Sequence, residues 1–305
     1  MVSVKFASLF AFVAASMVAA APAALKKRAD IDTTILQYAL TLEHLEAKFY
    51  HTALKNLSAK DFANAGYAPA IRERFAEIGG HEIQHVQFLE AAIGADANKA
   101  CTYDFGAGVT DVKSFIATSQ LLEGVGVSAY LGAAALITNP TYLTAAGSIL
   151  TTESRHSAWV QSSAALSDPA GAAYDVPTNF NQTYSLAAPL IKSCPKSNTA
   201  LPVMAFPTLT LNPASNLQPG QTVSVSGKGV KDGQYLAVLT AGGQYFSKIE
   251  NGKATVPKKT STGRSYFLVT SSNGTVSDDS TIAGPVASDY LLSASQAYDL
   301  VKSQY

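Results

Sequence analysis

The pattern of apolar positions changes midway along the chain. From residue 30 to about 166, apolar residues recur every three or four positions, which is the spacing of amphipathic helices. From 203 to about 284, apolar and polar residues alternate between Pro-Gly, Lys-Gly and Gly-Gly turn signals, as in short strands. The chain is therefore predicted to be an α+β multidomain protein. We expect a helical bundle over 29–200, a small Ig-like β-sandwich over 203–284 and a tail or short helix over 285–305.

The helical part divides into four long segments. The apolar spacing and the breaker residues predict helices over 32–57, 69–94, 111–138 and 141–166. Four long helices with short connections are typical of a helix bundle. The third segment is almost wholly apolar, so a membrane span is the alternative to a buried bundle helix. It nevertheless contains Glu123, and a buried carboxylate is costly unless a positive charge faces it.

The N-terminus has the layout of a secretory signal. Lys5 precedes an apolar run from Phe6 to Ala20 that ends in small residues. We expect a signal peptide over 1–20, with a membrane anchor as the alternative, although the run is short for a bilayer span. A basic triplet, 26–28, predicts a propeptide over 21–28. The protein is thus expected to be secreted or at the cell surface, with no membrane span after signal removal.

Composition agrees with a folded, secreted protein. Of 305 residues, 47% are hydrophobic and 14% are charged, and the formal net charge is zero with no basic stripe, so nucleic-acid binding is not expected. In an oxidising compartment Cys101 and Cys194 would pair, and two free buried thiols are the alternative. Three sequons predict glycosylation at Asn56, Asn181 and Asn273.

The segment HEIQH, residues 81–85, has two interpretations. As H-E-x-x-H it is a zinc-protease signature, in which both histidines bind zinc. As E-x-x-H it is half of a di-metal carboxylate site in a helix bundle. On a helical wheel Glu82 lies at the centre of the apolar face, His85 is slightly to one side and His81 is on the flank, which favours the second interpretation.

A second E-x-x-H strengthens this interpretation. The fourth helix contains TESRH, where Glu153 and His156 share one face but no histidine matches His81. The first and third helices share another pattern, a glutamate followed seven residues later by a tyrosine. These pairs are Glu43 with Tyr50 and Glu123 with Tyr130.

The predicted metal ligands are Glu43, Glu82, His85, Glu123, Glu153 and His156. Their four carboxylates would balance two divalent cations if both histidines are neutral. Carboxylate and imidazole ligands suit Fe or Mn, so two Fe or Mn ions are the expected cofactors. A metal-free polar cluster is the alternative. Glu46 also lies on the inner face of its helix and competes with Glu43 as a ligand, while Tyr50 and Tyr130 are expected to support the ligands through hydrogen bonds.

With these residues the chain resembles the secreted fungal ferritin-like proteins described as stress-response or desiccation-related. The runs LEHLEAKFY and HEIQHVQFL carry the resemblance, which covers about residues 30–200. It implies a ferritin-like four-helix bundle and two-metal roles for the six ligands. We expect an oxidoreductase, ferroxidase- or catalase-like, that reacts with O₂ or peroxide. The alternative is a non-catalytic, metal-stapled stress or cell-surface protein whose β domain binds a wall polymer or a protein partner.

Overall fold

The protein is described from a computed structural model, which covers residues 23–292 together with 299 and 302. The predicted signal peptide and most of the predicted tail lie outside the described residues. Of the predicted propeptide, only the backbone of 23–28 is described, as the start of the first helix. Within the described part, no helix is both long and apolar enough to cross a bilayer.

The helical part contains four long helices and two short ones, with four short 3₁₀ or π segments between them. The helices are α1 (Ala23–Asn56), α2 (Ala59–Asn64), α3 (Pro69–Ile93), α4 (Val112–Ala134), α5 (Pro140–Trp159) and α6 (Phe180–Ala187). The short segments are η1 (Gly94–Asp96), η2 (Gly106–Val109), η3 (Val160–Ala164) and η4 (Ala188–Leu190).

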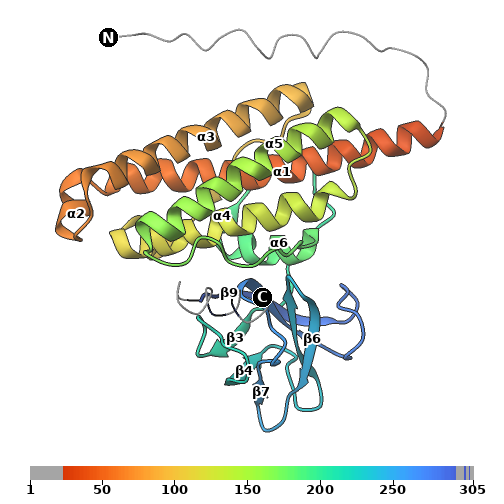
Figure 1. Ribbon diagram of the computed structural model, residues 1–305. Coiled ribbons are helices and arrows are strands. Elements are labelled where there is room, and N and C mark those ends of the chain that lie inside the picture. The colour runs from red at the N-terminus through yellow and green to blue at the C-terminus, as the bar shows by residue number, and fades with distance from the viewer. Residues whose placement is uncertain (1–22, 293–298, 300–301, 303–305) are drawn as a thin grey trace.

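The four long helices form the predicted bundle, in which α1 lies against α3 and α4 against α5 (Figure 1). The short helices α2 and α6 were not predicted, although each begins with a capping box. Ser58 and Asp61 cap α2, and Asn179 and Gln182 cap α6. One end of the bundle is filled by aromatic rings packed against one another, with centroids 4.6–6.3 Å apart. These rings belong to Phe49, Tyr50, Phe62, Phe75, Phe115 and Trp159.

The second half of the chain is a two-sheet sandwich, as predicted. Its strands are β3 (Leu209–Asn212), β4 (Thr222–Gly227), β5 (Tyr235–Thr240), β6 (Gly243–Lys248), β7 (Lys253–Thr255), β8 (Gly263–Thr270) and β9 (Thr281–Tyr290). The antiparallel orders are β3-β4-β7 and β6-β5-β8-β9, and the facing apolar side chains form one core. The predicted boundary at residue 284 was too early, because β9 continues pairing with β8 to Tyr290.

The four-stranded sheet also packs against the bundle on its other face. Tyr266 and Leu268 of β8 contact Val125 of α4, and Tyr266 donates a hydrogen bond to Ser128 Oγ at 2.7 Å. Strands β5 and β8 are therefore buried on both faces, which explains their continuous apolar runs. The sandwich and the bundle share an interface rather than being joined only by a linker (Figure 1).

A largely buried arginine anchors this interface to α4. Arg264 forms a bidentate pair with Asp289, at 2.8 and 2.9 Å, and donates to the backbone carbonyls of Leu121 and Gln120. A Cβ atom at Gly124 would lie 2.0 Å from Arg264 Nη1, so only glycine admits the guanidinium here. Gly124 directly follows Glu123, one of the predicted ligands, in the sequence of α4.

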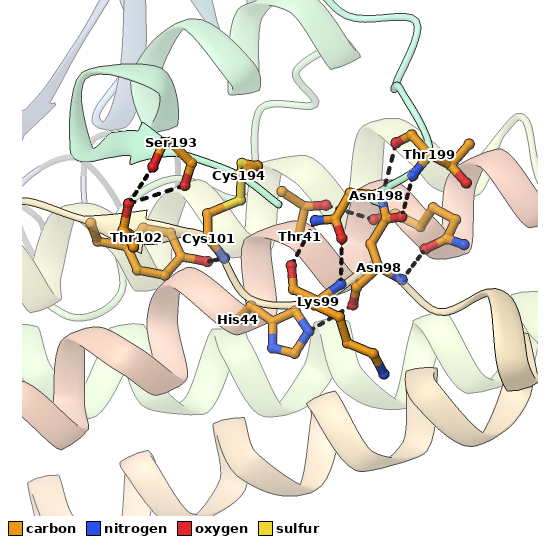
Figure 2. The surroundings of a disulfide bond; sticks show 12 residues. Thr41, His44, Asn98, Lys99, Cys101, Thr102, Ser193, Cys194, Asn198 and Thr199 are labelled. Atoms are coloured by element: carbon orange, nitrogen blue, oxygen red, sulfur yellow. Dashed lines mark hydrogen bonds between the residues drawn. A yellow bond between two sulfur atoms is a disulfide. The ribbon is translucent and has the colours of Figure 1, made fainter. Parts of the chain in front are cut away.

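A clasp joins the loop after α3 to the segment after α6 (Figure 2). Cys101 and Cys194 form a disulfide across 93 residues, beside the small sheet of β1 (Thr102–Tyr103) and β2 (Ile191–Ser193). Asn98 exchanges two hydrogen bonds with the backbone of Thr199. His44 of α1 reaches the carbonyl of Asn98 at 3.1 Å, so this histidine is half-buried in the clasp although a helical wheel places it on the polar face of α1.

Candidate metal centre

The six predicted ligands come together in the middle of the bundle. Each long helix contributes acidic side chains to one internal cluster, and the four glutamates among the six are fully buried. The i, i+3 spacing brings His85 next to Glu82, and His156 next to Glu153, on their inward faces. The cluster thus joins all four long helices at one level.

The cluster divides into two groups whose ligand atoms lie within 4.8 Å of one another. One group is Glu43, Glu82, His85 and Glu153, and the other is Glu82, Glu123, Glu153 and His156. Both E-x-x-H glutamates therefore belong to both groups, while each group has one glutamate and one histidine of its own. Glu82 and Glu153 could therefore each serve two metal ions, while the other ligands would each serve one.

The distances around the histidines follow the same division. His85 Nδ1 is 3.2 Å from Glu43 Oε2 and 3.0 Å from Glu82 Oε2. His156 Nδ1 is 3.1 Å from Glu123 Oε2 and 3.1 Å from the other oxygen of Glu82. Glu82 thus lies between the two imidazoles with one oxygen toward each, and each histidine presents Nδ1 to the cluster.

The two tyrosines cross between the helices. Tyr50 of α1 donates to Glu123 of α4, and Tyr130 of α4 donates to Glu43 of α1 at 2.5 Å. The seven-residue repeat in the sequence therefore becomes a reciprocal pair, in which each tyrosine holds the glutamate of the opposite helix. Burial raises the pKa of both hydroxyls well above the usual range, so they remain hydrogen-bond donors.

The cluster contains buried carboxylate oxygens that have no hydrogen-bond donor in the described part of the chain. Both oxygens of Glu153 and Oε1 of Glu82 are buried without a hydrogen bond from the described residues. The 3.1 Å approach of His156 to Glu82 Oε1 is close enough for an ion pair but lacks hydrogen-bond geometry. Such oxygens are costly unless a cation binds them, and their donor set suits Fe or Mn, so these residues fit a pair of divalent ions.

The pKa values show how the cluster compensates without a cation. Burial and repulsion from Glu123 raise the pKa of Glu82 to about 7, and burial raises that of Glu153 well above its usual range. Burial lowers the pKa of His156, but its hydrogen bond to Glu123 and the negative charge of the nearby Glu82 outweigh burial and raise the pKa to about 9. Protons thus replace the cations in part.

The helical region matches a known family. The family model described as "Ferritin-like domain" matches residues 31–165. Residues 31–165 form a ferritin-like domain. The chain is also 28% identical over 183 residues to Protein rds1 of Schizosaccharomyces pombe (strain 972 / ATCC 24843). That match covers 60% of this chain and 44% of the yeast protein, so the chain spans less than half of its relative.

Glu46 occupies a separate place in the ferritin-like domain. It is buried but belongs to neither ligand group, and its Oε1 lies over Gly126 of α4. A Cβ atom at Gly126 would lie 2.8 Å from Glu153 Oε2 and 3.4 Å from Glu46 Oε1. Gly126 therefore makes room for two carboxylates. Glu46 is a fifth buried glutamate on α1, and α4 has a glycine opposite it.

His81 has a partner that sequence analysis missed. Its Nδ1 lies 2.9 Å from His156 Nε2, and the two rings stack with 8° between their planes. His81 belongs to neither ligand group, so the two histidines of HEIQH do not meet at one ion as in a zinc protease. The helical wheel places His81 on a flank of α3 and cannot show which residue of α5 faces it.

The sequons differ in their surroundings. Asn56 and Asn273 are exposed. Asn181 is half-buried, and its amide donates to Asp278 at 2.7 Å while its oxygen accepts from the backbone of Met204. A glycan on Asn181 would disrupt this contact between the helical part and the sandwich. The amide of Asn56 is also engaged, because it donates to the carbonyl of Val109 at 3.1 Å, whereas Asn273 is exposed at a loop and can carry a glycan.

Proposed function

We propose that the chain is a secreted di-metal carboxylate protein that binds two Fe or Mn ions and reacts with O₂ or peroxide. The observation that carries the proposal is the division of one buried cluster into two ligand groups that share Glu82 and Glu153. Glu43 and His85 would hold one ion, and Glu123 and His156 the other. The Cys101–Cys194 disulfide supports secretion, because disulfides persist in oxidising compartments.

When bound, the ions would supply the electrons that reduce O₂ or peroxide. The chain's own residues do the rest. Tyr50 and Tyr130 orient the two unshared glutamates, and His81 orients the ring of His156. Burial keeps bulk water away from the carboxylates of the cluster, since all four ligand glutamates are fully buried.

Oxidant consumption tests this proposal. The protein is loaded with two equivalents of Fe²⁺ without air and then mixed with O₂ or H₂O₂ while the oxidant and the optical spectrum are followed. We expect consumption of the oxidant at a rate far above that of free Fe²⁺ in the same buffer. A Glu153→Ala/His156→Ala variant with full activity would contradict the proposal.

A structural metal role is the second candidate. It is favoured by the way the cluster joins all four long helices, so that two ions would cross-link the domain. In that case chelation lowers the thermal stability of the protein, while no O₂ or peroxide is consumed. The same loaded sample distinguishes the two functions.

A further inference from the structure

A small cavity lies in the bundle layer next to the candidate ligands. Leu42, Leu89 and Ile149 line it, and each is within about one helical turn of a ligand on its own helix. The ring of Tyr130 forms another wall, and its hydroxyl donates to Glu43. The cavity therefore ends at a side chain that touches the metal cluster.

The cavity exists because small residues occupy inward positions. Ala129 and Ala133 of α4 face Ala146 of α5, where larger residues would fill the space between the helices. Its volume is about 30 Å³, compared with the ~10–15 Å³ that holds one water molecule. The pocket opens to solvent on one side, and its inner space is large enough for a diatomic gas.

The lining is unsuited to water. Nearly all of it is carbon, and its one carboxylate, Asp32, already accepts two hydrogen bonds from Thr138. The Tyr130 hydroxyl is likewise engaged with Glu43. A buried water needs two to four polar partners, and apolar cavities without them stay dry and bind apolar gases.

The other surroundings of the cluster among the described residues differ from this pocket. The far end is filled by packed aromatic rings, including Phe49, Phe75 and Phe115. On the side of His81 and His85 the surroundings are polar and partly exposed, which suits metal ions and peroxide. The apolar cavity is thus the approach that selects for an uncharged, apolar molecule.

We propose that this cavity is a binding site for dioxygen, from which the gas reaches the cluster past the Tyr130 ring. The inference rests on the proposed function, since it names O₂ as the oxidant that enters by this route. Peroxide, which is polar, takes the histidine side.

Xenon and two filled variants test the proposal. Ala133→Leu and the smaller change Ala146→Val fill the cavity from opposite helices, and Ala117→Leu is the control because Ala117 is exposed on α4. In crystals under xenon pressure we expect xenon beside Tyr130 in the wild type and in Ala117→Leu, but not in Ala133→Leu.

In Fe²⁺-loaded protein of equal metal content, the rate constant for O₂ should fall about fivefold or more in the filled variants, because the space is lost. The rate constant for H₂O₂ should stay within about twofold.

The outcomes separate the two claims. Absence of xenon from the wild type overturns the gas site, and an unchanged O₂ rate constant in both filled variants overturns the route. If xenon binds but the loaded wild type consumes no O₂, the gas site stands while the proposed oxidative function fails.

Discussion

His81 Nδ1 lies 2.9 Å from His156 Nε2, on the side of the imidazole opposite to the metal cluster. Nδ1 of His156 faces Glu82 and Glu123, so this nitrogen would bind the metal. The ring proton would then be on Nε2, which points away from the cluster and toward His81. His81 accepts that proton and so fixes both the tautomer and the orientation of the ring.

Replacement of His81 by alanine is therefore expected to weaken metal binding. Partners of this kind contribute about 10–100-fold in metal affinity. Calorimetric titration with Mn²⁺ measures the effect, and His51→Ala is the control because His51 is an exposed histidine on α1. Equal affinities for the two variants would show that His81 is a surface residue without this role.

Arg264 is expected to be essential for stability although it lies far from the cluster in sequence. An Arg264→Met change removes the charged partner of the largely buried Asp289 and leaves it only the hydrogen bond from Gln120, which costs about 3–5 kcal/mol in the free energy of unfolding. Denaturant unfolding at constant pH measures it. The exposed pair of Arg74 and Glu77 provides the control, because Arg74→Met should cost less than about 1 kcal/mol. A cost for Arg264→Met as small as that of the control would mean that the sandwich does not depend on this anchor.

The chelated protein should lose stability as the pH rises from about 5 to 9. In the folded state the pKa of Glu82 is raised from 4.5 to about 7 and that of His156 from 6.5 to about 9. Both groups bind protons more tightly in the folded protein than in the unfolded chain. Their contribution to the free energy of unfolding is therefore complete at a pH below the unfolded-state pKa values, and it is lost as the pH rises through the folded-state pKa values. A pKa that is higher by one in the folded state corresponds to ~1.4 kcal/mol in the free energy of unfolding. Thermal melts at several pH values check this prediction, and a melting temperature that rises over the same interval contradicts it.

Metal binding should reverse this trend. Two cations need deprotonated ligands, so affinity increases with pH and binding releases protons. Melts of the Mn²⁺-loaded protein over the same pH range provide the comparison.

The clasp should contribute substantially to stability. A Cys101→Ser/Cys194→Ser variant opens a loop of 93 residues, and loss of such a crosslink typically costs about 2–5 kcal/mol. Reduction of the native protein should produce a similar decrease in the free energy of unfolding, while reduction of the variant should produce none. A native protein whose unfolding is insensitive to reductant would contradict this.

The sequence predicted the two-part architecture because period and composition are local signals. Buried Glu82 and Glu123 interrupt apolar faces, so their helices and their inward direction could be inferred from the spacing alone. The short helices were missed although their capping boxes were visible, because each is too brief to show a hydrophobic period.

Other features depend on which elements meet, and no single segment shows this. The contact between His81 and His156 joins α3 to α5, and Arg264 reaches α4 across 143 residues. The continuous apolar run of β8 was a usable signal that both faces of that strand are covered. The partner on the second face, α4, could not be named from that run.

Metal stoichiometry is the sharpest test of a two-metal site in the bundle. Mn²⁺ is titrated into the chelator-treated protein and into Glu43→Gln, Glu82→Gln and Glu73→Gln, the last being an exposed glutamate on α3. Bound metal is counted after gel filtration, and electron paramagnetic resonance reports whether the ions are coupled. We expect two coupled ions in the wild type and in Glu73→Gln and one ion in Glu43→Gln. Binding of both ions should weaken in Glu82→Gln, because Glu82 belongs to both ligand groups. Absence of saturable binding, or a single ion that Glu82→Gln leaves in place, would contradict the two-metal site.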